Sequence, residues 1–224
     1  PETEKSDVLA GVKGALGYRQ LKLGIIAIFF YVGIEVGIPS KLLFYLSEPL
    51  SKGGILGSAV VGGLISGFYW LLMLVGRFVS AFISGKVSSR IQLTTTSVVA
   101  ISLLLVAIFM PETSKINLII PDITHWKLID AEVPTNVVFI VLCGLCTSVM
   151  WGVIYNLATE GLGRYTASAS GLFMTMVFGG GVMPLIQDLI ATKIGDINSY
   201  WLVVAMLSYL LFYALVGSRQ SKNN

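Results

Sequence analysis

Charged residues are scarce in this sequence of 224 residues. Asp, Glu, Lys and Arg together make up 12% of it, whereas 55% is hydrophobic. A soluble globular domain carries about 25% charged residues, so this composition excludes an ordinary soluble domain and indicates an integral membrane protein. The formal net charge of +3 is too small to indicate a partner such as nucleic acid.

Cysteine and histidine are nearly absent. The sequence holds only Cys143, Cys146 and His125. A metal pair or a redox Cys-x-x-Cys motif is one interpretation of the two cysteines, which lie one helical turn apart in an apolar run. There is no second pair, and the histidine is distant in sequence, so two ordinary buried thiols are the better interpretation. We expect no metal site and no cofactor.

Catalytic signatures are lacking as well. The sequence contains no His-Glu-x-x-His, no paired-aspartate motif, no Gly-x-Ser-x-Gly and no P-loop. We therefore expect a protein that is not an enzyme. Because the first residue is Pro1 rather than Met, we also expect the chain to be a piece of a longer protein.

Long apolar runs dominate what is present. A helix needs roughly 20 apolar residues to cross a bilayer, and six runs of suitable length cover 21–46, 57–80, 91–110, 135–159, 168–191 and 200–216. The sequence predicts an all-α integral membrane fold with six transmembrane helices. The bundle would occupy 23–217, after a cytoplasmic linker at 1–22 and before a cytoplasmic tail at 218–224. In the longest loop, 111–134, the apolar piece Ile116–Ile120 fits either a short strand or an interfacial turn.

Basic residues predict the orientation, since Lys and Arg gather on the cytoplasmic side of a membrane protein. With six spans, one side holds Lys5, Lys13, Arg19, Lys22, Arg77, Lys86, Arg90, Arg164, Arg219 and Lys222, while the other holds Lys41, Lys52, Lys115, Lys127 and Lys193. Both termini are therefore expected in the cytoplasm.

Glu35 lies near the middle of the first span. A carboxylate at that depth costs a few kcal/mol, so it normally faces protein or a water-filled cavity. Gly37 and Pro39 follow within a turn, which predicts a helix break, and breaks at that depth occur where the backbone lines a cavity or is covered by protein. A role at a functional site is the favoured interpretation of Glu35, and a bond to a buried structural partner is the alternative.

Other polar and aromatic groups also lie at depth. The candidates for a solute pathway are Tyr31, Glu35, Trp70, Trp151, Asn156 and Gln187. Simple packing stays open for the two tryptophans, and hydrogen bonding between helices stays open for Asn156 and Gln187. Because these groups are spread over at least four spans, the pattern favours a permeation pathway over a reaction centre.

Four stretches resemble four helices, in the same order, of the fucose and glucose/galactose symporters of the major facilitator superfamily. Tyr31–Ser40 looks like their seventh helix, Tyr69–Phe78 like the eighth, Trp151–Gly163 like the tenth and Gly179–Gln187 like the eleventh. The basic turn Gly85–Arg90 is a degenerate form of the superfamily's cytoplasmic gating motif. The likeness covers nearly the whole chain in the right order.

This resemblance implies the carboxy-terminal half, helices 7–12, of a twelve-helix transporter in a bacterial inner membrane. The amino-terminal six-helix half would be its partner. The implied activity is uptake of a monosaccharide such as fucose, glucose or galactose, coupled to protons or, in some members, to sodium. The candidates above would bind the sugar, and Arg77, Lys86 and Arg90 would serve a cytoplasmic gate. Transport of another small polar solute, such as a nucleoside or drug, and a structural or sensory role without transport stay open.

Overall fold

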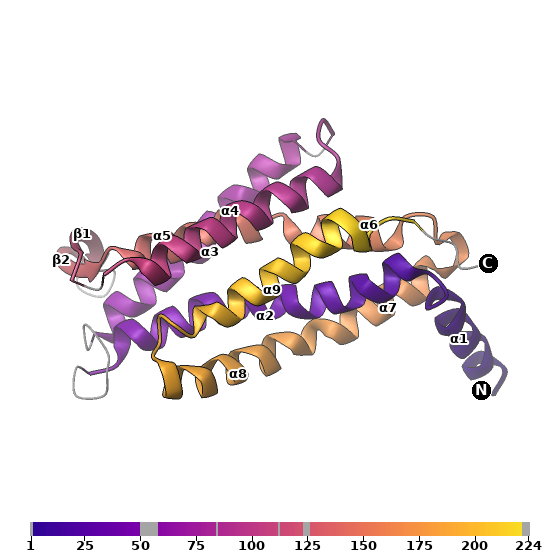
Figure 1. The fold of residues 1–224 in the computed structure, drawn as a ribbon, viewed down its shortest axis with the longest axis horizontal. Coiled ribbons are helices and arrows are strands. Elements are labelled where there is room, and N and C mark those ends of the chain that lie inside the picture. The colour runs from indigo at the N-terminus through magenta and orange to yellow at the C-terminus, as the bar shows by residue number, and fades with distance from the viewer. Residues whose placement is uncertain (1, 50–57, 84, 112, 123–125, 221–224) are drawn as a thin grey trace.

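The computed structural model describes residues 2–49, 58–83, 85–111, 113–122 and 126–220. Within these residues, six helices are long and apolar enough to cross a membrane. They are α2 (Arg19–Ser47), α3 (Ala59–Ile83), α4 (Ser89–Phe109), α5 with α6 (Asn136–Thr147 and Met150–Thr159), α7 with α8 (Thr166–Thr175 and Gly179–Ile194), and α9 (Tyr200–Phe212) with its π-helical end Tyr213–Gly217. The predicted six-helix membrane fold is confirmed, and both termini lie at the same end of the bundle (Figure 1).

The polar segment before the first span is largely helical. Helix α1 (Glu2–Ala15) leaves the bundle obliquely beside the N-terminus (Figure 1). It packs on the start of the fifth span, where a side chain at Gly14 would overlap the Tyr165 ring. Residue 1, residue 57 at the expected start of the second span, His125 and residues 221–224 of the tail lie outside the described residues. The cytoplasmic placement of 1–22 and 218–224 stays a prediction.

Helix α2 is the central element of the bundle. It contacts α3, α5, α6, α7, α8 and α9, and Figure 1 shows it between α9 and α8. The break predicted near Gly37 and Pro39 does not occur, because α2 is continuous through Pro39. A proline removes one helical hydrogen bond, and neighbouring helices compensate for such losses in a membrane. The bond lost here is the one to the Glu35 carbonyl, and the Ile38 carbonyl next to Pro39 accepts a separate hydrogen bond from the Tyr200 hydroxyl of α9 at 3.1 Å.

Tyrosines of the last helix hold α9 against α2. Their hydroxyls donate to backbone carbonyls of α2: Tyr200 to Ile38 at 3.1 Å, Tyr209 to Leu23 at 3.1 Å and Tyr213 to Gln20 at 3.0 Å. These bonds lie toward both ends of α2. The two antiparallel helices are therefore fixed in rotation as well as in distance.

Glycine allows α8 to approach α2 closely. A Cβ at Gly179 would overlap the Phe29 carbonyl oxygen, and one at Gly180 would lie 2.9 Å from the Val32 side chain. A single 3₁₀ turn, Met176–Phe178, interrupts the fifth span just before these glycines. Pro184 lies inside α8 without ending it.

The longest loop forms an antiparallel hairpin of β1 (Lys115–Asp122) and β2 (Lys127–Pro134). Ile120 pairs with Ile129, and the buried Ile120, Ala131 and Val133 belong to the hydrophobic core. Ile116–Ile120 is thus a strand rather than an interfacial turn, and the otherwise all-α bundle carries one short hairpin at the end opposite the termini (Figure 1).

Candidate functional site

A pocket of about 410 Å³ lies beside the break between α5 and α6. It is lined by Arg77 and Ser80 of α3, Ser148 and Val149 of the break, and Trp151 and Gly152 of α6. Ser80 and Ser148 were not among the residues expected from sequence. The sequence signal for Ser148 is the Thr147-Ser148 pair inside an apolar run, and Ser80 has no comparable signal.

Hydroxyl groups satisfy the backbone where the helix breaks. Thr147 donates to the carbonyls of Cys143 and Gly144 at 3.2 Å, and Ser148 donates to the Leu145 carbonyl at 2.6 Å. Such side-chain bonds compete with the regular helical pattern. Irregular backbone within a membrane occurs where it lines a cavity or is covered by protein, and this break forms one wall of the pocket.

Glu35 forms an ion pair with Arg77, which lines this pocket. The Arg77 Nη2 atom lies 3.4 Å from Glu35 Oε1, with 57% of the Arg77 side chain and 15% of the Glu35 side chain exposed. Ionisable residues inside membrane spans generally pair with one another. The carboxylate that the sequence marked as costly is therefore compensated by a cation from the neighbouring helix.

Tyr31 and Trp151 complete the arrangement. Tyr31 is fully buried one turn before Glu35 on α2, so the two residues lie on one face of that helix. Its ring contacts the Trp151 ring edge-on, with centroids 6.1 Å apart and planes inclined at 63°. Tyr31, Glu35, Arg77 and Trp151 thus form one connected group from three helices, which we call the Glu35 cluster.

The Glu35 cluster offers contacts suited to a polar, uncharged molecule. A carboxylate accepts hydrogen bonds and a guanidinium donates up to five. In the pocket wall the Ser80 hydroxyl can do either, whereas Ser148, which donates to Leu145, can accept. An indole provides an apolar face as well as an N–H donor. Because Glu35 and Arg77 already neutralise each other, the cluster does not call for a charged ligand.

Trp70 is on the same helix as Arg77 but does not line the pocket beside the α5–α6 break. It is 46% exposed on α3, two helical turns before Arg77, and its ring contacts Tyr69 edge-on at 5.7 Å. The Tyr69 hydroxyl in turn bonds Thr147 at 2.9 Å. Residues seven apart lie on the same face of a helix, so Trp70 and Arg77 share one exposed face of α3.

Asn156 and Gln187 lie away from the Glu35 cluster. Asn156 lines a separate pocket of about 490 Å³ together with Arg90 and Glu160. Gln187 is buried, donates to the Ser199 hydroxyl at 3.3 Å and lies close to Gly37. Its observed contacts are with protein, although a role in binding stays a prediction for both residues.

The residues expected at a gate are also separated. Arg77 belongs to the Glu35 cluster, whereas Lys86 lies in the turn between α3 and α4 and Arg90 in the first turn of α4. Lys86 and Arg90 are exposed. Their gating role stays a prediction.

A second charged group, not expected from sequence, joins α2 to α8. Lys41 Nζ lies 3.0 Å from Asp188 Oδ1 and 2.6 Å from Asp196 Oδ1. Only 11% of the Lys41 side chain is exposed. The partners are 147 or more positions apart in the chain, so only the fold brings them together.

The architecture defines the class of protein: a multi-pass membrane protein with the fold of one half of a major facilitator superfamily transporter. The crystal structure of such a transporter, FucP, in the outward conformation, superimposes with a TM-score of 0.72 at 18% sequence identity. The match covers 90% of this chain and 43% of that chain. No protein-family model matches the sequence.

Curated relatives are sugar transporters by name. A glucose/galactose transporter of Brucella abortus biovar 1 (strain 9-941) is 30% identical over 202 residues, which are 90% of this chain and 43% of the relative. A putative glucose/galactose transporter of Helicobacter pylori (strain ATCC 700392 / 26695) is 28% identical, covering 95% and 47% of the two chains. The L-fucose-proton symporter of Escherichia coli (strain K12) is 21% identical, covering 92% and 41%. The expected resemblance to these symporters is confirmed, and the chain spans less than half the length of each.

Proposed function

We propose that this chain is the carboxy-terminal half of a secondary active transporter that moves a monosaccharide across a bacterial inner membrane. The observation that carries the proposal is the Glu35 cluster: an ion pair and two aromatic rings beside an irregular segment of a membrane helix. The names of the relatives support a hexose or fucose as the solute. Their greater length supports a second, amino-terminal half as the partner.

In this proposal the two halves rock around a sugar near the bilayer midplane, as in other transporters of alternating access. Glu35 accepts hydrogen bonds from sugar hydroxyls, Arg77 and Ser80 donate to sugar oxygens, and Trp151 covers an apolar face of the ring. Trp70 extends the same surface toward the partner half. Lys86 and Arg90 act at the gate on the cytoplasmic side, where both termini lie.

The coupling ion in this proposal is the proton, which the name of the fucose relative supports. Sodium is the other ion that the test must include. Glu35 is the one carboxylate of the Glu35 cluster, and a proton on it would weaken its pairing with Arg77. Protonation of Glu35 would thus link the ion gradient to the sugar site.

The test is uptake of radiolabelled galactose, glucose and fucose by proteoliposomes that contain the full-length protein. A proton gradient, a sodium gradient and no gradient are compared at one pH. We expect gradient-driven uptake, reduced about tenfold or more by Glu35→Gln. The matched control is Asp130→Asn, which changes an exposed carboxylate on the hairpin in the same way and should leave uptake unchanged.

Counterflow with nucleosides and a cationic drug separates this function from its rivals. Exchange of one of these solutes, but of no sugar, would contradict the sugar assignment. A protein that exchanges none of the solutes, and whose thermal stability none of them raises, would contradict transport altogether. Unchanged sugar uptake and pH dependence in Glu35→Gln would contradict the role of Glu35.

A further inference from the structure

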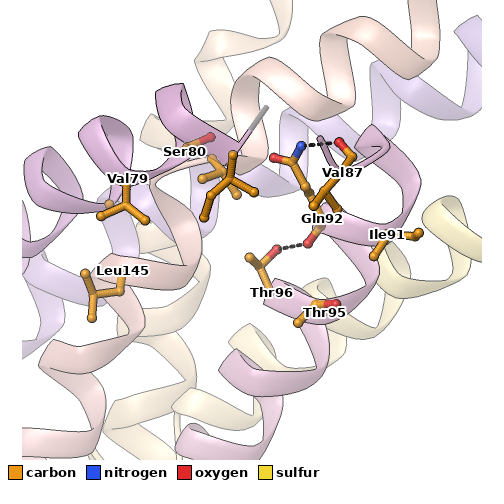
Figure 2. A pocket seen from close by; sticks show the side chains of 11 residues that line it. Val79, Ser80, Val87, Ile91, Gln92, Thr95, Thr96 and Leu145 are labelled. Atoms are coloured by element: carbon orange, nitrogen blue, oxygen red, sulfur yellow. Dashed lines mark hydrogen bonds between the residues drawn. The ribbon is translucent and has the colours of Figure 1, made fainter. Parts of the chain in front are cut away.

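A second pocket, of about 480 Å³, opens between α3 and α4 at the end of the bundle that carries the termini. Figure 2 shows Val79 and Ser80 of α3 and Leu145 of α5 on one side, and Ile91, Gln92, Thr95 and Thr96 of α4 on the other. We call it the α3–α4 pocket. Its volume falls within the roughly 300–1,000 Å³ typical of small-molecule sites.

The lining of the α3–α4 pocket is suited to hydrocarbon. It is dominated by aliphatic side chains: Val79, Ile83, Val87, Ile91, Leu145 and Val149. Two of the polar groups in the wall are engaged with the backbone, since the Gln92 amide donates to the Val87 carbonyl at 2.7 Å and the Thr96 hydroxyl to the Gln92 carbonyl at 2.8 Å (Figure 2). These two groups therefore do not need a polar ligand.

The basic residues near the α3–α4 pocket differ in their partners: Arg77 pairs with Glu35, and Arg90 shares a pocket with Glu160. From Gly76 to Met110 the sequence holds Arg77, Lys86 and Arg90 and no Asp or Glu. Lys86 lies in the α3–α4 turn, between the lining residues Ile83 and Val87. Among the described residues, the ion pairs do not include Lys86. A hydrocarbon pocket with an unneutralised cation at one end is complementary to an amphiphile with an anionic head.

We propose that the α3–α4 pocket binds an acyl chain of an anionic phospholipid whose phosphate pairs with Lys86. The pocket lies at the end of membrane-crossing helices, where the headgroups of one leaflet are found, so a bilayer would supply this ligand directly. Basic pockets between membrane helices bind anionic headgroups, at about 1 kcal/mol per Lys or Arg. The proposal goes beyond sugar transport and does not depend on the transported solute.

A bound lipid would act on the Glu35 cluster through shared walls. Ser80 and Val149 line both the α3–α4 pocket and the pocket of the Glu35 cluster. An acyl chain packed against them would hold α3 and the α5–α6 break at a fixed separation. The lipid would thereby stabilise the wall of the sugar site without touching the sugar.

Native mass spectrometry of the full-length protein tests the proposal directly. Dioleoylphosphatidylglycerol and dioleoylphosphatidylcholine are added separately to the delipidated protein in mild detergent, and bound lipid is counted. We expect about fivefold tighter binding of the anionic lipid, the ratio that follows from one Lys contact. Val79→Trp should fill the α3–α4 pocket and abolish this bound species, and Lys86→Gln should reduce the anionic lipid to the level of the zwitterionic one.

Two controls match these variants. Phe78→Trp places an indole on α3 at a 64% exposed position outside the pocket, and Lys193→Gln removes an exposed cation at the opposite end of the bundle. Both should bind lipid as the unmodified protein does. If Val79→Trp fails to fold, Ile91→Trp fills the pocket from α4. Equal binding of the two lipids, no binding of either, or wild-type binding by both pocket-filled variants would overturn the proposal.

Discussion

Arg77 of α3 and Glu35 of α2 form an ion pair, with 3.4 Å between Nη2 and Oε1. The pair connects a residue that the sequence assigns to a gate with one that it assigns to a sugar site. Both side chains contribute to the same group as Tyr31 and Trp151. A change at one partner therefore leaves the other charge uncompensated beside the proposed sugar site.

A double-mutant cycle measures this dependence. Glu35→Gln and Arg77→Gln are each expected to reduce galactose uptake about tenfold or more, because each leaves a lone charge in a membrane helix. The double variant should be less impaired than the sum of the single changes. Since the Arg77 side chain is 57% exposed, solvent screening limits the expected coupling energy to about 1 kcal/mol. Strictly additive losses in the initial rate would refute functional pairing.

Neighbouring glycines provide a test of the α2–α8 contact. Gly179→Ala should lower the melting temperature, because the new methyl would overlap the Phe29 carbonyl and overpacking costs about 1–3 kcal/mol. Gly181→Ala meets no atom within 4 Å. It should be neutral or stabilising by up to about 1 kcal/mol, as Ala favours helix over Gly. Similar melting temperatures for the two variants would show that α8 does not lie on α2 as described.

The hydrogen bonds from tyrosine hydroxyls to α2 can be tested by variants that remove one hydroxyl group each. Tyr200→Phe and Tyr213→Phe each remove a hydroxyl that donates to a carbonyl of α2. Hydrogen bonds between membrane helices contribute about 0.6 kcal/mol on average. We expect each variant to melt slightly lower and the double variant to show the sum, in thermal unfolding followed by fluorescence. A double variant as stable as the unmodified protein would contradict a stabilising role.

Lys41 is expected to clamp α2 to α8 and to the segment that follows it. Lys41→Met should lower the melting temperature, because Asp196, with 22% of its side chain exposed, loses its partner at 2.6 Å. Asp196→Asn should destabilise more than Asp188→Asn, since Asp188 is 48% exposed and better solvated. Lys193→Met is the matched control. The reverse order of the two Asp variants would argue against the clamp.

The membrane class and the number of spans follow from the sequence, because a helix that crosses hydrocarbon must be apolar along its length. Glu35 and Tyr31 could be placed on one face of a helix from their spacing, and their relation holds in the fold. The sequence also shows three consecutive glycines, Gly179–Gly181, inside an apolar span. It does not say that Gly179 and Gly180 contact α2 while Gly181 contacts nothing, since that depends on the rotation of a neighbouring helix.

The local sequence pattern was a less reliable guide to where the membrane helices break. Gly37 and Pro39 predict a break in α2, yet the helix, which packs against α8 and α9, is continuous through both residues. The break occurs instead at Ser148 and Val149, where the residues are not strong helix breakers. Their hydroxyl and backbone groups bond locally and face a pocket, which no one-dimensional pattern reveals.

The sequence by itself determined that this is a six-helix membrane protein with intramembrane polar groups, because length, hydropathy and charge are properties of single segments. Only the tertiary structure decided that Glu35 pairs with Arg77 rather than with another cation, that Lys41 reaches Asp188 and Asp196, and that Gln187 bonds Ser199. These are relations between separate segments of the chain. Their distances are set by how closely small residues let the helices approach, and that becomes definite only in the packed bundle.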